Sequence, residues 1–210
     1  MKKKFDTGFL AVALYRECVA NIVPIPKKDG KVRMCMDYRD LNQVSPKDNF
    51  PLPHIDVFVD KTTNFALFSF MGGFSGYNQK KMALEDMEKT TFVTLWGMFC
   101  YKVMSFGFKN ARATYQRAMV ALFHNMMHKE IEVYTDDMIA KSRTEEEHFV
   151  NLRKLFKRLL KYRLRLNPAK CTFGVKLGKL LDFIVSQKGI EVDPDKVKAI
   201  LEMPEPRTKK

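Results

Sequence analysis

The chain has 210 residues, of which 46% are hydrophobic and 12% aromatic, and this composition predicts a globular protein of one large or two small domains. Its 37 Lys and Arg residues outnumber 24 Asp and Glu residues, and the net charge of +13 at pH 7 favours nucleic acid as a partner over a basic surface without function or a membrane-surface protein. The four scattered cysteines form no C-x-x-C pair, which argues against a zinc site or a disulfide framework and favours a reducing compartment.

No targeting or membrane segment is predicted. The apolar run at residues 8–14 follows three lysines, but it is short, and Arg16 and Glu17 stand where a cleavage site needs small residues. No run approaches the roughly 18 apolar residues of a membrane span. We therefore expect a cytoplasmic protein with no membrane partner.

The first quarter of the chain predicts a hairpin and a connector. Residues 19–26 and 31–36 have the composition of two short strands, and the basic residues 27–30 form the turn between them. Residues 44–53 contain three prolines, which is typical of an irregular connector.

The middle of the chain predicts a buried strand, a second hairpin and a long helix. Residues 65–71 form an apolar run of strand length that ends at Gly72 and Gly73. Residues 90–93 and 99–103 pair around a turn at Trp96 and Gly97. Residues 110–127 lack Gly and Pro and repeat apolar residues at helical spacing.

The last third predicts two hairpins and two helices. Residues 131–140 form a tight strand-turn-strand with two adjacent acids at its tip. Residues 145–162 form an amphipathic helix, for which we expect one apolar stripe made of Phe149, Leu152, Phe156 and Leu159. A further hairpin spans residues 180–192, and Asp193 with Pro194 starts a final helix that runs to Glu202.

The acidic tip, Tyr134-Thr135-Asp136-Asp137, is the most informative tetrapeptide. Two adjacent carboxylates repel each other, and a divalent cation that neutralises both stabilises such a pair. Phosphoryl transfer uses sites of this kind. By itself, however, an Asp-Asp pair is more often a solvated turn than a metal site.

Several segments in one order resemble a known family, the reverse transcriptases of gypsy-class LTR retrotransposons, notably those of plants. The resemblance covers essentially the whole chain, and ordered motifs are far more specific than any single one. The segments are residues 19–24 (VANIVP), 27–33 (KKDGKVR), 37–42 (DYRDLN), 50–54 (FPLPH), 74–77 (FSGY), 106–107 (FG), 113–116 (ATYQ), 134–137 (YTDD) and 167–171 (NPAKC).

The resemblance implies an α+β fold of the right-hand polymerase type. One reverse transcriptase domain would span residues 1–210, with fingers at about 1–46 and 80–103, palm at about 47–79 and 104–188, and the start of a thumb at about 189–210. The implied reaction is template-directed nucleotidyl transfer to a primer 3′-OH. The implied partners are an RNA or DNA template with its primer, a deoxynucleoside triphosphate and other polyprotein domains, within virus-like particles.

Five residues match the family's nucleotide site. Lys27 and Arg33 match fingers residues that hold the triphosphate, although by themselves they indicate an exposed basic hairpin. Tyr77 matches the aromatic residue that excludes a ribose 2′-OH, and the alternative is a core tyrosine. Phe106 and Gly107 match the segment under the template and nucleotide, or form a buried strand-to-helix turn.

The remaining matched residues concern catalysis and the primer. Asp136 and Asp137 match two metal ligands, and the family uses two Mg²⁺ ions, with Mn²⁺ as a possible replacement. Lys170 matches the residue proposed to protonate pyrophosphate, or it is a lysine in a solvated loop. The other matches are assigned to template and primer contacts, and they are Arg112, Gln116, Leu181, Asp182 and Phe183.

The sequence departs from the family at special positions. Gly72 stands where the family carries a third catalytic aspartate, and Arg112 stands where relatives have Gly or Pro, at a helix start that faces the template. Thr135 and Asp182 also replace a usual apolar residue and a usual Gly. These changes indicate a degenerate copy whose polymerase activity is lost or severely impaired.

Three hypotheses follow from this pattern. The chain is a reverse transcriptase domain by descent with lost or severely impaired activity, a non-catalytic nucleic-acid-binding protein, or the product of a pseudogene that is translated rarely or never. Gly72 separates the first hypothesis from the other two.

Overall fold

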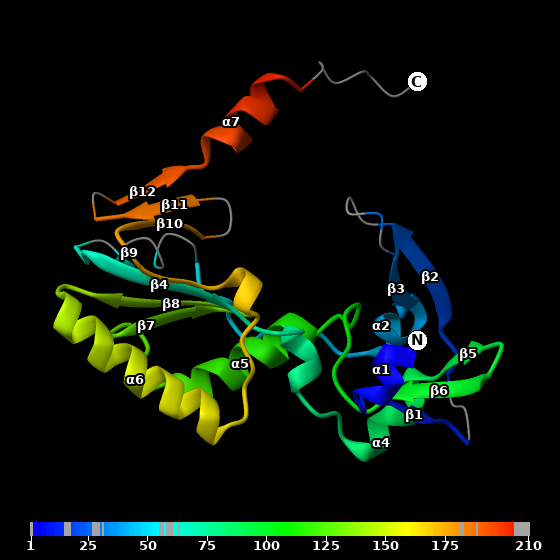
Figure 1. The fold of residues 1–210 in the computed structure, drawn as a ribbon. Helices are drawn as coiled ribbons and strands as arrows, with labels where there is room; N and C mark the ends of the chain where they lie inside the picture. The colour runs from blue at the N-terminus through cyan, green and yellow to red at the C-terminus, as the bar shows by residue number, and fades with distance from the viewer. Residues whose placement is uncertain are drawn as a thin grey trace. The chain divides into compact units, whose positions relative to one another are not determined.

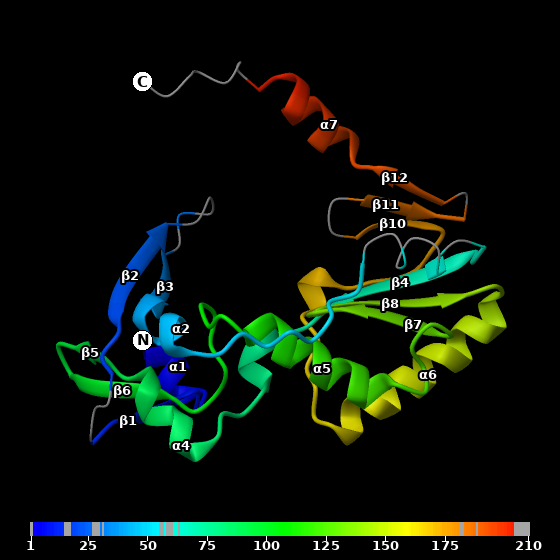
Figure 2. The ribbon, with the colours of Figure 1, turned by 180° about the vertical axis from the view of Figure 1, so that it is seen from behind.

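The computed structural model describes residues 2–14, 18–26, 30, 32–54, 57, 61–62, 64–180, 183–187 and 189–203. The chain folds into two compact units, each made of two stretches of sequence. The first unit comprises Met1–Leu52 and Phe74–Leu122, and the second comprises Pro53–Gly73 and Phe123–Lys210. Their elements are labelled in Figures 1 and 2.

The first unit contains two small antiparallel sheets and several short helices. One sheet has the strand order β1-β6-β5, and β2 pairs with β3 as a hairpin. A core of Leu10, Met36, Phe92 and Tyr101 joins them. The elements are α1 (Lys2–Asp6), β1 (Leu10–Val12), β2 (Asn21–Pro26), β3 (Val32–Asp37), α2 (Arg39–Val44), η1 (Gly76–Gln79), α4 (Leu84–Met87), η2 (Glu88–Thr90), β5 (Phe92–Thr94), β6 (Gly97–Tyr101) and α5 (Ala111–Phe123), whose last residue belongs to the second unit.

The second unit contains a four-stranded sheet of order β7-β8-β4-β9 and a three-stranded sheet of order β10-β11-β12. Helix α6 covers one face of the four-stranded sheet (Figure 1). The elements are β4 (Leu67–Gly72), β7 (Ile131–Tyr134), β8 (Asp137–Ser142), α6 (Glu145–Lys161), η3 (Pro168–Lys170), β9 (Thr172–Val175), β10 (Leu177–Leu180), β11 (Phe183–Ser186), β12 (Gly189–Val192) and α7 (Pro194–Leu201).

Strand β4 is buried along its whole length, as its continuous apolar run predicts. Alternate residues point to opposite faces of the sheet. Phe68 and Phe70 pack with Ile139 and Val185 on one face, whereas Ser69 on the other face is hydrogen-bonded to His148 of α6. The strand that carries residue 72 is therefore fixed from both sides.

The predicted apolar stripe of α6 is only partly right. Leu159 is buried and Leu152 is half-buried, whereas Phe149 and Phe156 are exposed. The helix buries His148, Asn151 and Leu155 in their place. Hydrogen bonds decide the orientation, because His148 contacts Ser69 at 2.7 Å and Ser142 at 3.0 Å, and Asn151 donates to the Ser142 hydroxyl. Polar residues of the helix thus satisfy polar residues of the sheet.

Other predicted elements are present with shifted ends. The helix predicted to end at residue 127 ends at Phe123, where a turn begins in which the amides of Met126 and Met127 donate to the Phe123 carbonyl. The second hairpin turns at Leu95 and Trp96, one residue earlier than predicted. The hairpin in residues 180–192 gains a third strand, β10. Asp193 caps α7, as predicted, by accepting a hydrogen bond from the Asp195 amide.

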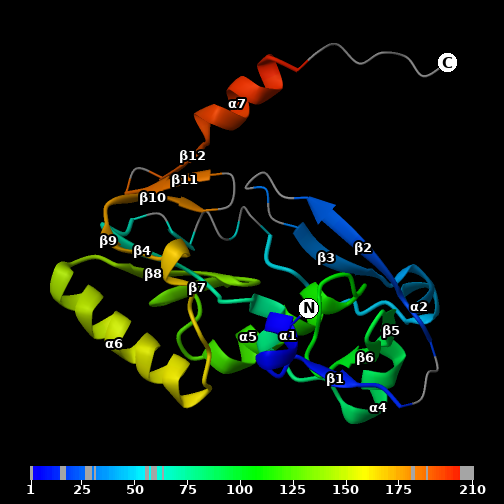
Figure 3. The same ribbon diagram turned by 45° about the vertical axis from the view of Figure 1, so that its right-hand side comes forward.

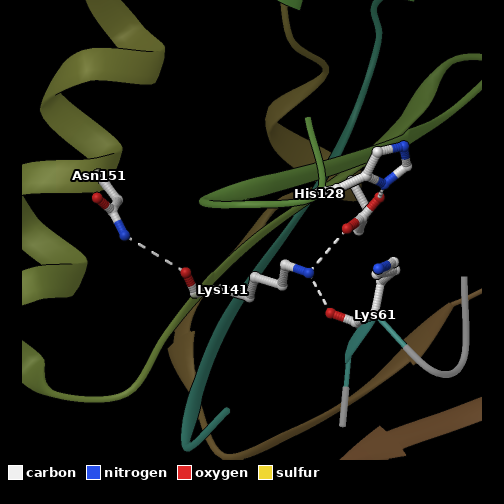
Figure 4. Close-up of polar contacts among 5 residues, drawn as sticks. Lys61, His128, Lys141 and Asn151 are labelled. Carbon is white, nitrogen blue, oxygen red and sulfur yellow. Dashed lines mark hydrogen bonds and ion pairs between the residues drawn. The ribbon is translucent and has the colours of Figure 1, made fainter. Parts of the chain in front are cut away.

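A buried ion pair joins β7 and β8. Lys141 Nζ lies 2.7 Å from Glu132 Oε1, and the two side chains are 1% and 2% exposed. The Lys141 ammonium also donates to the Lys61 carbonyl, and His128 contacts the second Glu132 oxygen (Figure 4). The same ammonium lies over the Phe65 ring. Burial lowers the pKa of Lys141, and Glu132 opposes that shift. The network ties the segment before β4 to the sheet.

Candidate functional site

The Asp136-Asp137 pair lies on a two-residue turn between β7 and β8. Tyr134 pairs with Asp137 across the hairpin, so Thr135 and Asp136 form the loop. Thr135 has a φ of 52°, a left-handed conformation that disfavours a β-branched residue. The Thr135 hydroxyl donates to Asp136 Oδ1 at 3.3 Å. The tight strand-turn-strand predicted from the sequence is confirmed, and its tip is strained.

Gly72 is the direct cross-strand neighbour of Asp137. Strands β4 and β8 are antiparallel, and their register pairs Gly72 with Asp137 and Met71 with Met138. The Gly73 amide donates to the Asp136 carbonyl at 2.7 Å and holds the end of β4 against the acidic turn. A carboxylate at residue 72 would thus stand beside the Asp pair, because directly opposed side chains in a sheet are close neighbours.

Lys170 occupies the space beside Gly72. A Cβ atom built on residue 72 would lie 2.7 Å from Lys170 Cδ and 2.9 Å from Lys170 Cβ. Two contacts hold this arrangement, since the Asn167 amide donates to the Gly72 carbonyl and the Asn167 side chain caps η3. Helix η3 can approach this closely because residue 72 has no side chain.

The charges at this tip partly compensate one another. Burial and the neighbouring Asp136 carboxylate raise the pKa of Asp137, while the Lys170 ammonium opposes that shift. Lys170 Nζ lies 3.9 Å from Asp136 Oδ2, but both side chains are partly exposed, so solvent screens this pair. Among the described residues, Lys170 is the cation that lies next to the two aspartates.

The residues at the tip do not fit a pair of divalent ions bridged by carboxylates of two strands. Asp136 and Asp137 come from the same hairpin, and residue 72 on the facing strand offers no ligand. Within the described ranges, no three His, Cys, Asp or Glu side chains are grouped as they would be around a metal ion. Two adjacent carboxylates remain as possible ligands.

Three aromatic rings meet in the first unit. The Tyr77 ring lies 5.0 Å from the Phe106 ring and 5.3 Å from the Tyr115 ring, between centroids. Tyr115 is buried, whereas Phe106 is 50% exposed and offers a ring surface. The structure therefore brings Tyr77 and Phe106 together, and their assignment to the nucleotide site stays a prediction. Tyr115 had no predicted role, although it lies within the ATYQ motif.

Gly107 is required by its backbone conformation. Its φ is 104°, a value that side chains disfavour, and its carbonyl accepts a hydrogen bond from Asn42 Nδ2 at 2.8 Å. Asn42 had no predicted role, and its side-chain oxygen also accepts a hydrogen bond from the Lys109 amide. Asn42 belongs to the DYRDLN motif, 65 residues before Gly107, and no local pattern indicates a contact over this distance.

The other predicted residues have varied positions. Arg112 is an exposed residue in the first turn of α5, and Gln116 is fully buried on the same helix, so its assignment to the template stays a prediction. Arg33 lies on β3 opposite Ile25, and Phe183 begins β11. Lys27, Leu181 and Asp182 lie outside the described residues.

The mixed helices and antiparallel sheets, with the acidic hairpin at a strand tip, fit an α+β polymerase fold. The chain matches the foamy viral protease-reverse transcriptase dRH in complex with double-stranded DNA with a TM-score of 0.88 and 24% identity, over 97% of this chain and 36% of that one. It matches the same type of enzyme in complex with an RNA/DNA hybrid with a TM-score of 0.82 and 24% identity, over 98% of this chain and 27% of that one.

The family model of reverse transcriptases (RNA-dependent DNA polymerases) matches residues 25–205, and the chain belongs to this family. It is 35% identical over 187 residues to the Pol polyprotein of transposon 297 and 34% identical over 174 residues to that of transposon gypsy, both of Drosophila melanogaster. These matches cover 87% and 83% of this chain but 18% and 17% of the relatives. The chain thus spans less than a fifth of the length of these curated relatives.

Proposed function

We propose that this chain is the reverse transcriptase domain of a gypsy-class retrotransposon polyprotein that binds a primer-template but does not extend the primer. The family's reaction is nucleotidyl transfer to a primer 3′-OH, and in the family two metal ions assist it. The observation that carries the proposed loss of activity is Gly72 opposite Asp137, with Lys170 packed where a third carboxylate would stand.

The expected loss is large because the missing group acts on developing charge. Removing one preorganised electrostatic contact reduces an enzyme's rate by about 10²–10³. A ligand that bridges two ions contributes to both, so its absence should cost more. Arg112 adds a second obstacle, since we expect its side chain at the start of α5 to conflict with the template.

Nucleic-acid binding requires neither a carboxylate at residue 72 nor metal ions. Residues 153–170 contain eight Lys and Arg and no acid, and this segment supports contacts to phosphates. The solved relatives in complex with double-stranded DNA and with an RNA/DNA hybrid support the same class of partner. For the nucleotide we propose that Tyr77 and Phe106 face the sugar and base, and that Arg33 and Lys27 hold the triphosphate.

The test is primer extension on poly(rA)/oligo(dT) with Mg²⁺ or Mn²⁺. We expect no extension by the unmodified chain or by either single variant, and partial recovery when Gly72→Asp and Arg112→Gly are combined. Asp136→Ala added to the combined variant should abolish the recovered activity. Robust extension by the unmodified chain that Asp136→Ala removes would overturn the proposal.

Binding is measured separately by retention of labelled primer-template. We expect sequence-independent binding that falls by at least about tenfold between about 50 and 200 mM salt, since lysine and arginine contacts release counterions. No binding at the lower salt concentration would contradict this part of the proposal. Binding without extension would favour the non-catalytic nucleic-acid-binding protein among the three hypotheses.

A further inference from the structure

A cleft with a volume of about 550 Å³ lies within the first unit. It is lined by residues from three segments, 41–46, 80–90 and 104–114, which include parts of α2, α4 and α5 (labelled in Figure 3). None of its lining residues is assigned above to the metal ions, the nucleotide, the template or the primer. The volume is typical of pockets that bind small organic molecules, which measure about 300–1,000 Å³.

Hydrogen bonds between the three segments fix the walls of the cleft. Asn110 Nδ2 donates to the Pro46 carbonyl at 2.7 Å and joins the first segment to the third. The Met104 amide donates to the Lys80 carbonyl at 2.8 Å and joins the second segment to the third. Asn42, as described above, holds residues 107 and 109 in the same way. Because the lining is already ordered, a ligand does not have to order it on binding, which favours affinity.

Apolar side chains form much of the lining. Met104 and Ala111 are buried, while Leu41, Met82 and Phe108 are half-buried. Apolar surface that a ligand places against these side chains leaves water, and this transfer is favourable. Methionine side chains also adapt their shape to different apolar ligands. The lining therefore suits a ligand with an apolar body.

The charged side chains of the lining are mostly cationic, since four of them are lysines and one is an acid. Lys89 lies 2.8 Å from the carboxylate of that acid, Asp86, so these two charges compensate each other. The Lys109 ammonium donates to two uncharged backbone carbonyls, which leaves its charge uncompensated. Lys80 and Lys81 are exposed, and their side chains form no hydrogen bond or ion pair with another residue that the structure describes. The cleft therefore carries an excess of positive charge, which favours an anionic ligand.

The uncharged polar side chains of the lining are largely used within the protein. The side chains of Asn42, Ser45, Thr90 and Asn110 are hydrogen-bonded to backbone groups of the first unit. A nucleotide in the cleft would bury the polar groups of its base and sugar with few partners, and burying such groups unpaired is unfavourable. A ligand with one anionic group and no other polar group avoids this penalty.

We propose that this cleft binds an amphiphilic organic acid, a small molecule with an apolar body and one carboxylate. The apolar body packs against Met82, Met104 and Phe108. The carboxylate faces the ammonium groups of Lys80 and Lys81, which donate charge-assisted hydrogen bonds to it. The site uses none of residues 72, 136 and 137, so the proposal is independent of polymerase activity.

The test is isothermal titration calorimetry of the full chain with decanoate, which has an apolar chain and a single carboxylate. We expect one site with a dissociation constant between about 10 μM and 1 mM, as the size of this ligand allows. Decylammonium has the same apolar chain and the opposite charge, and it should bind at least about tenfold more weakly. No decanoate binding up to about 5 mM, or equal binding of both ligands, would overturn the proposal.

Two pairs of variants separate this site from general attraction to a basic protein. Lys81→Glu should weaken decanoate binding by at least about fivefold, whereas Lys129→Glu, the same change at an exposed lysine of the second unit, should leave it unchanged. Ala83→Trp should weaken the binding by filling the cleft, whereas Leu84→Trp, at a residue that is 84% exposed and does not line the cleft, should have no effect. Circular dichroism checks that all four variants fold. Equal effects within either pair would overturn the proposal, as would release of bound decanoate by primer-template, which would assign these lysines to nucleic acid.

Discussion

Lys170 occupies the position that a side chain of residue 72 would fill, because a Cβ atom at Gly72 would lie within 3 Å of both Cδ and Cβ of Lys170. The Cδ atom can move with its flexible side chain, but the Cβ atom can move only with the backbone of η3. A residue larger than glycine at this position therefore requires a shift of η3, which the Asn167 amide holds to the Gly72 carbonyl.

We predict that Gly72→Ala lowers the free energy of unfolding by about 1–3 kcal/mol, the usual effect of overpacking. In a Lys170→Gly background the same substitution should have a smaller effect, with a coupling free energy of at least about 0.5 kcal/mol. Urea unfolding of the parent chain, the two single variants and the double variant gives the double-mutant cycle from which this coupling free energy is calculated. Equal effects of Gly72→Ala in both backgrounds would show that Lys170 does not restrict residue 72.

The buried pair of Lys141 and Glu132 gives a second prediction. Lys141→Met leaves the Glu132 carboxylate buried without its main partner, and we expect a loss of about 3–5 kcal/mol in the free energy of unfolding. Glu132→Leu added to Lys141→Met should recover most of it, since the pair is then replaced by apolar side chains. Chemical denaturation measures both values. A single variant as stable as the parent would mean that the pair is open to water.

His148 predicts how stability depends on pH. Burial lowers the pKa of His148 below its ordinary value, while the neighbouring Glu147 opposes that shift. The imidazole stays neutral in the folded state between Ser69 and Ser142, whereas in the unfolded chain it binds a proton near pH 6.5. Its contribution to stability is thus present above that pH and is lost as the pH falls toward the folded pKa.

We expect the free energy of unfolding to drop between about pH 7.5 and pH 5.5, and His148→Gln to make that drop smaller. The comparison of the two proteins isolates His148, since other groups titrate in both. Denaturant unfolding at several pH values provides the data. An identical drop in both proteins would assign the dependence to other groups.

The C-terminal end of the described chain should open first. None of the residues of α7 is buried, and Ile200 and Leu201 are 64% and 80% exposed. Segments with few buried contacts unfold locally at low free energy. We predict that limited proteolysis cuts first between β11 and the end of α7, as mass spectrometry of early fragments would show. Early cleavage within α5, which buries Tyr115 and Met119, would contradict this.

The sequence alone determined the elements whose signals are local. The acidic hairpin, the buried run of β4 and the capped start of α7 were predicted because alternation, apolar continuity and an Asp-Pro pair act over a few residues. The family and the absence of a carboxylate at residue 72 also follow from ordered motifs. The sequence did not predict where α5 ends or where the second hairpin turns, because turns outside the periodic pattern determine these positions.

Only the tertiary structure decided which side of α6 is buried. The sequence offers apolar residues on two neighbouring sides of this helix, and hydrophobic spacing cannot rank them. Hydrogen bonds from His148 and Asn151 to the sheet select one side, and they join residues far apart in the sequence. The contacts of Gly72 with Asp137 and Lys170 have the same origin, since strand register and the position of η3 arise from long-range packing rather than from local sequence.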